Sequence, residues 1–548
     1  MINNTIIDIA NPVLPGFHPD PSMIRVGNDY YLAVSTFEWF PGVRIYHSSD
    51  LINWEYITAV LDSFDMADLR GICASDGIWA PCLSYSDGFF HLIYSIIHGA
   101  RSYPVMEVSN YLTRAKEITG PWSKPVYLNS SGFDPSLFHD DDGRKWLLNM
   151  EWDYRKVSDG NPFSGILIQE YDPFTETLIG TPQKIFAGTP IGSLEGPHIY
   201  KRNGYYYLFC AEGGTGWLHA ATVARSLSLN GPYEVHPNNP LLTSPDVRND
   251  DMIPLKERTT PELGSAYLKK AGHASLCDTP DGSWYIAHLC SRPVPKTACC
   301  VMGRETAIQQ IVWKNDWPYL AGGGNLPMNS YPIHSAKNPR NIQEKTSDIK
   351  LYTFYDKDFL KDFQTLRIPF DDNIFNIKER QGYLRIYGKE SIFSRFNQAL
   401  VARRQSDFCF KAETSFIFRP DSFQQSAGLI YRYDEANQYY LYATFDEESG
   451  TSAIGLSSVN QGCYKRLSYQ ILSGDNFTFS LDVRESTAQF SYSANDACVP
   501  IGPLLDSTIL SDDYADGFTG AFIGICVQDL QSMKQYADFK SFLYKSLS

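Results

Sequence analysis

The stretch VGNDYYLAVS (residues 26–35) decides the fold of this chain, because its pattern recurs four more times before residue 290. Each copy combines a turn that contains glycine, usually preceded by Asp or Asn, with an aromatic-rich run. Such a turn between apolar runs is the strongest short-range signal for a β-hairpin. The other copies are SDGFFHLIYS (86–95), DDGRKWLLNM (141–150), RNGYYYLFCA (202–211) and PDGSWYIAHL (280–289).

The spacing of these hairpins predicts a β-propeller. Consecutive turn glycines are 61, 55, 61 and 78 residues apart, close to the length of one blade. The longest spacing contains the polar tract 248–264, which we expect to be an inserted surface loop. Strong helical periodicity is absent, so we expect residues 1–320 to form a five-bladed β-propeller. The turn glycines are Gly27, Gly88, Gly143, Gly204 and Gly282.

A change in composition marks the end of the predicted propeller. Residues 321–350 are rich in Gly, Pro, Asn and Ser and lack apolar periodicity, which is typical of a linker. Short alternating strands return in residues 351–548, without the turn signature of the first half. We expect this part to be a lectin-like β-sandwich rather than a further set of blades. The whole chain is therefore predicted to be all-β.

Charge and composition exclude some classes of function. The chain of 548 residues has a formal net charge of -15 and no evident basic patch, so neither nucleic acid nor an acidic polymer is an expected partner. Aromatic residues make up 14% of the chain. Flat aromatic faces suit sugar rings, but a large β core alone also accounts for them.

Several features predict a cytoplasmic protein. The N-terminus lacks a basic region followed by an apolar run of signal-peptide length. No uninterrupted apolar window is long enough to span a membrane, so we expect no membrane partner. The eleven cysteines show no metal-type spacing and are expected to be reduced, mostly buried thiols.

Side chains that can do chemistry precede the turn glycines at similar distances. Trp79, Asp134, Glu195 and His273 each lie nine residues before the glycine of their hairpin, and Asp20 lies seven before. In a propeller, the strand that feeds each hairpin is the innermost one and runs beside the central channel. We therefore expect all five side chains to converge at one mouth of the channel.

Three carboxylates at such positions favour a functional role. Like charges at close range and partial burial both oppose ionisation, so a structural core would not select them. For any single Asp-Pro-Ser sequence, capping of a turn remains an alternative. Glycoside hydrolysis needs this kind of group, namely an acid of raised pKa and an ionised base or nucleophile.

Seven ordered motifs resemble glycoside hydrolase family 43. The resemblance is closest to the β-xylosidase branch, which joins the propeller to a C-terminal β-sandwich, and it spans nearly the whole chain. The motifs are GFHPDPS (16–22), STFEWFPG (35–42), GIWAP (77–81), GFDPSLFHD (132–140), EGPHIY (195–200), GHASL (272–276) and GRETA (303–307).

The resemblance implies a role for each acid. Asp20 matches the general base that activates water, and Glu195 matches the general acid that protonates the departing oxygen. Asp134 matches a third acid that orients Glu195 and keeps its pKa high. The family inverts the anomeric centre, so the carboxyl groups of Asp20 and Glu195 are expected to be roughly 6.5–9.5 Å apart.

The resemblance also implies a closed sugar pocket. Phe37 and Trp79 match its aromatic walls, although isolated aromatic residues usually belong to the core. Phe518, in DGFTGAF (516–522), matches a phenylalanine that the sandwich inserts toward the site. A pocket closed in this way admits one terminal sugar, which makes the enzyme exo-acting.

Two further residues have open assignments. Arg304 matches an arginine that bonds sugar hydroxyls and helps to set carboxylate protonation, while a buried ion pair with Glu305 is the structural alternative. His273 matches a histidine of the channel, which is either bonded to water or holds a hydrated calcium or similar divalent ion. A single histidine is a poor calcium site, so water would have to supply the other ligands.

The resemblance implies an inverting β-D-xylosidase that releases D-xylose from the non-reducing end of xylo-oligosaccharides. An α-L-arabinofuranosidase activity on arabinosyl substrates is compatible with the same pocket, because the two sugars present similar hydroxyl geometry. The alternatives are an arabinan-degrading hydrolase, which would want an open groove, and a non-catalytic sugar-binding propeller, which need not keep three acids. No cofactor is required for this reaction, and a homo-oligomer is expected.

Overall fold

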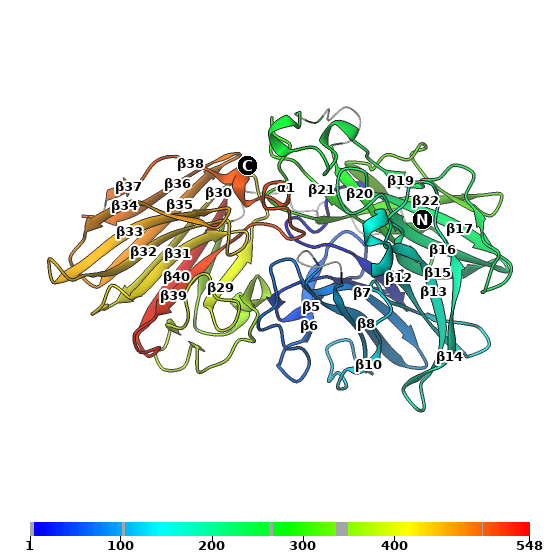
Figure 1. Cartoon of the computed structure of the whole chain (residues 1–548), viewed down its shortest axis with the longest axis horizontal. Coiled ribbons are helices and arrows are strands. Elements are labelled where there is room, and N and C mark those ends of the chain that lie inside the picture. The colour runs from blue at the N-terminus through cyan, green and yellow to red at the C-terminus, as the bar shows by residue number, and fades with distance from the viewer. Residues whose placement is uncertain are drawn as a thin grey trace.

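The computed structural model describes residues 5–100, 105–259, 261, 267–335, 349–495 and 497–547. Within these ranges nearly all regular structure is β-strand, and the one α-helix is the short α1 (Asp512–Ala515). Figure 1 shows two adjoining domains, the first coloured blue to green and the second yellow to red. The all-β prediction is confirmed.

The first domain consists of five consecutive antiparallel sheets, each built from strands in sequence order. Blade 1 contains β2 (Ser22–Val26), β3 (Asp29–Val34), β5 (Gly42–Ser48) and β6 (Glu55–Leu61). Blade 2 contains β7 (Gly77–Ser86), β8 (Phe89–His98), β9 (Glu107–Ala115) and β10 (Val126–Asn129). Blade 3 contains β11 (Ser136–His139), β12 (Lys145–Trp152), β13 (Phe163–Asp172) and β14 (Thr177–Phe186). Blade 4 contains β15 (Glu195–Arg202), β16 (Tyr205–Glu212), β17 (Ala220–Ser226), β18 (Glu234–Val235) and β19 (Leu242–Thr243), and blade 5 contains β20 (Lys269–Asp278), β21 (Trp284–Ser291), β22 (Glu305–Lys314) and β23 (Trp317–Leu320).

The first strands of the blades form a closed ring. β2 contacts β7 and β20, β11 contacts β7 and β15, and β15 also contacts β20. Each first strand passes into the second through one of the predicted hairpins, whose turn glycines all have positive φ angles between 64° and 86°. Glycine adopts this conformation without steric cost. The structure confirms the five-bladed propeller and places the predicted strands beside its channel.

The chain termini of the propeller pair with each other. β1 (Thr5–Ala10) and β24 (Ser330–Ser335) form a two-stranded antiparallel sheet. Ile7, Ile9 and Tyr331 pack there with apolar residues of blades 1 and 5. β24 lies inside the predicted linker 321–350, so that prediction was wrong for residues 330–335. Composition concealed the strand because its partner lies more than 300 residues away in the sequence; residues 336–348 lie outside the described ranges.

The second domain is a sandwich of two antiparallel sheets. One sheet has the order β27-β28-β40-β30-β35-β36-β37, with β25 on β40 and β38 on β36, and the other has the order β34-β33-β32-β31-β39-β29-β26-β4. The strands are β25 (Ile349–Thr353), β26 (Phe363–Leu366), β27 (Phe375–Asn376), β28 (Leu384–Tyr387), β29 (Ala399–Arg404), β30 (Cys409–Phe418), β31 (Gln425–Arg432), β32 (Gln438–Asp446), β33 (Thr451–Asn460), β34 (Cys463–Ile471), β35 (Asn476–Arg484), β36 (Thr487–Ala494), β37 (Ala497–Pro500), β38 (Leu505–Asp506), β39 (Phe522–Asp529) and β40 (Tyr536–Ser546).

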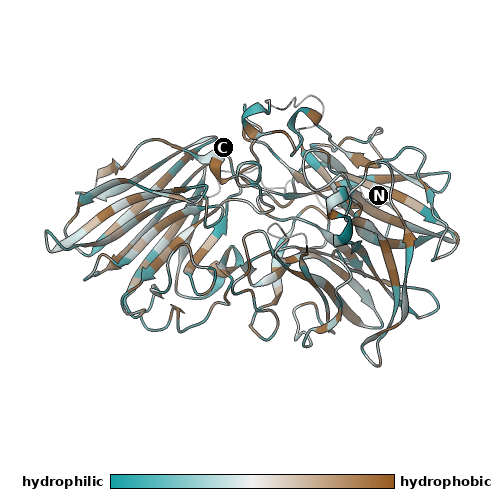
Figure 2. Ribbon diagram, in the orientation of Figure 1, coloured by the Kyte–Doolittle hydropathy of each residue, from teal (hydrophilic) through white to brown (hydrophobic). Residues whose placement is uncertain are grey.

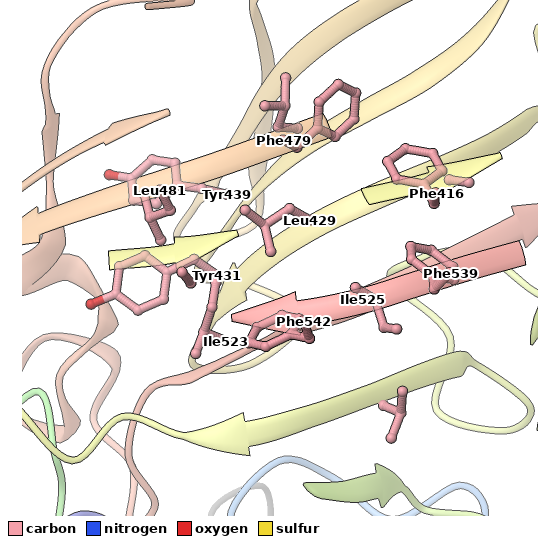
Figure 3. Close-up of a cluster of buried hydrophobic side chains, with 14 of the residues drawn as sticks. Phe416, Leu429, Tyr431, Tyr439, Phe479, Leu481, Ile523, Ile525, Phe539 and Phe542 are labelled. Atoms are coloured by element: carbon pink, nitrogen blue, oxygen red, sulfur yellow. The ribbon is translucent and has the colours of Figure 1, made fainter. Parts of the chain in front are cut away.

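Alternation along the strands builds the sandwich core. In β30, every second residue from Phe410 to Phe418 is buried and the intervening ones are partly exposed. Figure 2 shows the corresponding alternation of hydrophobic and hydrophilic colour along the strands of this domain. Inward-facing rings and aliphatic chains of both sheets then interdigitate, as Figure 3 shows for Phe416, Phe539 and Leu429. This is the period-2 pattern expected of sheets with one buried face.

The two domains share a β-sheet. β4 (Trp39–Phe40) comes from the propeller and pairs with β26 at the edge of a sandwich sheet. Trp39 is fully buried and stacks on Phe522 of the sandwich, with ring centroids 3.8 Å apart and an interplanar angle of 12°. Shared backbone hydrogen bonds and a buried stacked pair fix the orientation of the domains more firmly than a polar contact surface would.

The described part of the chain contains no helix with the length and apolar character needed to cross a membrane. All eleven cysteines are free thiols, and seven of them are buried.

We predict that Trp39→Ala lowers the free energy of unfolding by about 3–5 kcal/mol, because it empties a buried site between the domains. Chemical denaturation followed by fluorescence and circular dichroism measures this loss. Phe174→Ala is the control, since Phe174 is 96% exposed and should change the free energy by less than about 0.5 kcal/mol. Equal stability of Trp39→Ala and the wild type would contradict the role given to this residue.

Candidate active site

A cavity of about 410 Å³ lies between the mouth of the propeller channel and the sandwich. Its lining comes from all five blades and from the sandwich segment around α1, which lies between the domains in Figure 1. The structure brings every predicted site residue to this cavity: Asp20, Phe37, Trp79, Asp134, Glu195, His273, Arg304 and Phe518.

Each blade contains a left-handed residue near the cavity, either within the first strand or just before its regular part. In blades 2 and 4 the left-handed residue is Ala80 or Gly196, which follows Trp79 or Glu195 directly. The predicted offset of nine residues before the turn glycine therefore does not mark the same structural position in every blade. The reason is that the hairpins differ in length between blades. Positive φ in residues other than glycine costs about 1–3 kcal/mol and is typical of functional sites. The five residues are Asp20 (φ 52°), Ala80 (φ 39°), Asp134 (φ 55°), Gly196 (φ 57°) and His273 (φ 47°).

The Asp20 carboxylate is held from two sides. Ser35 Oγ donates a hydrogen bond of 2.6 Å to Asp20 Oδ2, and the backbone N–H of Ala80 in turn donates to Ser35 Oγ at 2.7 Å. His273 Nδ1 lies 3.8 Å from Asp20 Oδ1. This arrangement fixes an acceptor oxygen at the cavity, and it ties blade 1 to blade 2.

Asp134 is linked to the segment that carries Glu195. Its Oδ2 accepts a hydrogen bond of 3.0 Å from the backbone N–H of Gly196, the residue after Glu195. The pKa of Asp134 is raised to about 6, mainly by burial; the charge of Asp20 acts in the same direction, while His273 and the Gly196 hydrogen bond oppose the shift. Asp134 therefore influences Glu195 through both position and charge.

Glu195 has the environment of a proton donor. Its side chain is buried, and Oε1 has no hydrogen-bond partner in the described part of the chain. Burial raises the pKa of Glu195 well above its usual value, and the charge of Asp134 adds to the effect, while Arg304 opposes it. Both main causes disfavour the ionised form, so Glu195 retains its proton to higher pH than an ordinary glutamate.

Arg304 reaches the cavity with one buried donor unused. Its Nη2 donates to Thr215 Oγ1 at 2.5 Å, and its guanidinium lies 4.5 Å from the centroid of the Phe518 ring. Its Nε is buried and makes no hydrogen bond to the residues that the structure describes. Glu305 instead pairs with Arg292 at 2.7 Å, so the alternative ion pair between Arg304 and Glu305 is not formed.

Aromatic rings enclose one side of the cavity. Trp79 lies 5.8 Å from Phe37 and 5.7 Å from Phe518, measured between ring centroids. Ser75 holds two of these residues, because its carbonyl accepts from Trp79 Nε1 and its hydroxyl accepts from the backbone N–H of Phe518, both at 3.0 Å. The sandwich residue Phe518 is thus fastened to the propeller wall.

The surroundings of His273 do not supply a calcium cage. Calcium takes six to eight oxygen ligands. The carboxylate of Asp20 lies near the His273 ring, but another neighbour is the imidazole of His198, with ring centroids 6.3 Å apart. This donor set does not fit a calcium ion coordinated mainly by protein. A hydrated divalent ion at His273 stays a prediction, and no step proposed below runs through a metal.

Sequence reasoning missed a buried ion cluster at the cavity. Lys270 Nζ lies 3.0 Å from Asp512 Oδ2 and 2.9 Å from Asp513 Oδ1. Asp513 also accepts hydrogen bonds from Trp217 Nε1 at 2.7 Å and from the backbone N–H of Cys300 at 2.8 Å. No spacing in the sequence relates these residues. Lys270 stands three residues before His273, and the Asp512–Asp513 doublet stands shortly before Phe518.

The cluster has an uneven charge distribution. Burial raises the pKa of Asp512 to about 8, and the neighbouring charge of Asp513 contributes. Burial acts in the same direction on Asp513, but Lys270 and the hydrogen bonds lower its pKa overall. The cluster therefore favours one shared proton and joins blade 5 to α1.

The tract 248–264, predicted to be a surface loop, also reaches the active-site cavity, because its residue Asp251 lines it.

We predict that Lys270→Met lowers the free energy of unfolding by about 3–5 kcal/mol, because it removes the buried cation that Asp512 and Asp513 share. Asp513 keeps a second cation, Arg258, whose Nη1 lies 3.2 Å from Asp513 Oδ1. Chemical denaturation at neutral pH measures the loss. The matched control is Lys256→Met, since Lys256 is exposed on the short 3-10 helix Leu255–Glu257. If the two variants were equally stable, the cluster would not hold the domains together.

Comparison with known proteins places the chain in a family. Residues 9–318 match the family model described as glycosyl hydrolases family 43. Residues 352–545 match the model described as the β-xylosidase C-terminal concanavalin A-like domain, which confirms the lectin-like character of the sandwich.

Similar proteins cover the whole length. The chain is 44% identical over 557 residues to a protein of Bacillus subtilis (strain 168) named β-xylosidase, covering 98% of this chain and 99% of that protein. It is 43% identical to xylosidase/arabinosidase 43B of Humicola insolens, covering 98% and 97% of the two chains. The crystal structure of a xylan β-1,4-xylosidase from Bacillus halodurans C-125 superposes with a TM-score of 0.90 at 45% identity, covering 98% of this chain and 100% of that one.

These matches confirm the resemblance inferred from the motifs. The family model covers more than half of the chain, and the relatives extend through both domains. The chain therefore belongs to glycosyl hydrolase family 43.

Proposed function

We propose that this protein is an exo-acting, inverting β-D-xylosidase that releases D-xylose from the non-reducing end of xylo-oligosaccharides. One observation carries the proposal: a buried carboxyl group of raised pKa, Glu195, shares a cavity with the hydrogen-bonded carboxylate of Asp20. Relatives named β-xylosidase at about this level of full-length similarity support the choice of sugar.

The proposed reaction is a single displacement. Glu195 donates its proton to the glycosidic oxygen, so the departing sugar leaves as a neutral alcohol. Asp20 accepts a proton from a water molecule as the water oxygen attacks the anomeric carbon from the opposite face. The product is xylose of inverted configuration. A water molecule fits between base and sugar only if the two carboxyl groups are roughly 6.5–9.5 Å apart, which stays a prediction.

The remaining residues are proposed to position the sugar. Phe37, Trp79 and Phe518 offer apolar faces to the terminal pentose, and Arg304 offers guanidinium donors to its hydroxyl groups. Because Phe518 comes from the sandwich, the second domain narrows the entrance to the cavity. This shape supports exo action and counts against an endo-acting arabinanase, which needs an open groove.

We propose an α-L-arabinofuranosidase side activity at the same site. Humicola insolens xylosidase/arabinosidase 43B is named for both sugars, and the two present similar hydroxyl geometry to a small pocket. A non-catalytic sugar-binding propeller is disfavoured, because binding alone does not need three buried acids.

We also propose that the protein is cytoplasmic, which its eleven free thiols support. The homo-oligomeric state stays a prediction.

We predict that Glu195→Ala lowers kcat for xylobiose by about 10²–10⁴-fold, the usual contribution of a general acid. With a nitrophenyl xyloside the loss should be much smaller, because a good leaving group needs little protonation. Initial rates on both substrates test this, and polarimetry of the wild-type product tests inversion. Asp20→Ala is the matched comparison and should lose activity on both substrates. Equal losses of Glu195→Ala on the two substrates would contradict its role.

We predict that Asp134→Asn moves the alkaline limb of the kcat/KM profile to lower pH. The Asp134 charge raises the pKa of Glu195, so its removal lets Glu195 lose its proton at lower pH. The general acid works only when protonated, and kcat/KM reports the free enzyme. The asparagine side chain can still accept the hydrogen bond from the Gly196 N–H. The variant therefore removes the charge at this site while keeping the contact that positions the Glu195 segment. An alkaline limb that stayed in place would contradict this effect of Asp134.

A further inference from the structure

A second cavity, of about 490 Å³, lies between blade 1 and the sandwich. None of its lining residues belongs to the cavity of the proposed active site. Its lining includes Lys350, Lys361, Arg403 and Arg404, together with the rings of Tyr46, Trp54, Tyr56 and Tyr544.

Three arginines at this interface are buried without a counterion. Arg44, Arg403 and Arg404 are 0%, 6% and 5% exposed. Among the described residues, no carboxylate oxygen lies within 4.0 Å of their guanidinium nitrogens. Since a guanidinium stays protonated in proteins, the fold holds three positive charges here away from water.

Their hydrogen-bond partners are neutral. Arg404 Nε donates to the carbonyl of Phe17 at 2.6 Å, and Arg44 Nε donates to Tyr46 Oη at 3.3 Å. Arg403 donates to Tyr352 Oη at 2.9 Å and stacks 3.6 Å from the centroid of the Tyr544 ring. Neutral oxygens and rings solvate a guanidinium only in part, and they do not cancel its charge.

Two donor groups remain unused. In the described part of the molecule, Arg44 Nη1 and Arg404 Nη2 are buried and have no hydrogen-bond partner. His18 lies beside both arginines and adds no negative charge, because burial and these guanidinium groups hold its pKa well below the usual value. The combination of unpaired charge and unused donors is unfavourable unless a ligand completes it.

Two of the acids that line this cavity are separated from Arg403 by one hydroxyl group each, because Tyr352 Oη bridges Arg403 and Asp362 and Ser406 Oγ bridges Arg403 and Asp407. Asp362 accepts from Tyr352 Oη at 2.7 Å. Asp407 accepts from Tyr544 Oη at 3.0 Å and from Ser546 Oγ at 2.9 Å. The third lining acid, Glu55, has a side chain that is 79% exposed. They reduce the positive potential of the cavity but do not pair with the arginines.

Another arginine cluster at the same interface shows the contrast. Arg367 and Arg432 are also buried, but Glu435 lies 3.4 Å from Arg367 Nη2 and 3.7 Å from Arg432 Nη2. The chain therefore supplies a counterion to one buried arginine cluster of this interface and none to the other, which is the cluster beside the second cavity.

We propose that the second cavity binds a small oxyanion of the phosphate type through Arg404, with Arg44 and Arg403 supplying the surrounding positive charge. The planar guanidinium presents paired donors that match the oxygens of phosphate. Because Arg44 belongs to the propeller and Arg403 and Arg404 belong to β29 of the sandwich, the bound anion joins the two domains. The aromatic lining leaves room for a phosphate that is either free or attached to a sugar.

Thermal unfolding of the full chain in sodium phosphate and in sodium chloride of equal ionic strength tests the proposal. A ligand that binds only the folded state raises the midpoint with its concentration. We expect a saturable rise with inorganic phosphate and none with chloride. A pentose phosphate at the same concentration separates the two sources: a larger rise than with phosphate indicates a sugar phosphate, and an equal rise indicates the free ion. Equal midpoints in phosphate and chloride would overturn the proposal.

Two variants locate the binding. Arg404→Gln should lose the phosphate-dependent rise while hydrolysing a nitrophenyl xyloside at the wild-type rate. The matched control is Arg367→Gln, which removes a buried arginine that already has a counterion and should keep the rise. An unchanged rise in Arg404→Gln would overturn the assignment. If Arg404→Gln does not fold, titration calorimetry of the wild type with inorganic phosphate decides, since less than one binding site per chain would also exclude the proposal.

Discussion

Burial of the Glu195 carboxyl group is the constraint on which the proposed chemistry depends. A glutamate in water ionises well below neutral pH and is almost entirely deprotonated at neutral pH, so it makes a poor proton donor there. Here desolvation and the neighbouring charge of Asp134 both stabilise the protonated form, while Arg304 limits the shift. The acid and the base can therefore differ in protonation state although both are carboxyl groups in one cavity. The rest of the structure determines how much bulk water reaches that cavity.

One wall of the cavity comes from the second domain. Phe518 packs on Trp79 and under the Arg304 guanidinium, and Ser75 binds its backbone. The same sandwich segment carries Asp512 and Asp513, which pair with Lys270 of blade 5. On the other side of the interface, β4 extends a sandwich sheet and Trp39 stacks on Phe522. Loss of these contacts would expose Glu195 to water and lower its pKa, so the domain interface is part of the acid's environment.

The repeated hairpins of the propeller were predictable from the sequence, whereas contacts between residues far apart in the chain were not. Five hairpins with a common turn were enough for the propeller, and the residues upstream of them led to Asp20, Asp134 and Glu195. The register was less accurate, because hairpins of unequal length placed Trp79 and Glu195 one residue before the left-handed position. The pairing of β1 with β24 and the contact of Lys270 with Asp512 were not predictable, since no local pattern identifies a partner hundreds of residues away.

The site is organised before any sugar arrives. Asp20 is fixed by Ser35, the segment carrying Glu195 is fixed by the hydrogen bond from Gly196 to Asp134, and Phe518 is fixed by Ser75. Each of these bonds uses backbone or side-chain groups of the protein alone. An electrostatic environment built in this way does not have to reorganise as charge develops on the glycosidic oxygen, which is how enzymes gain most from fixed polar groups. The cost is paid in the left-handed backbone at Asp20, Asp134 and His273, and the large sandwich core and the shared sheet supply the stability that tolerates it.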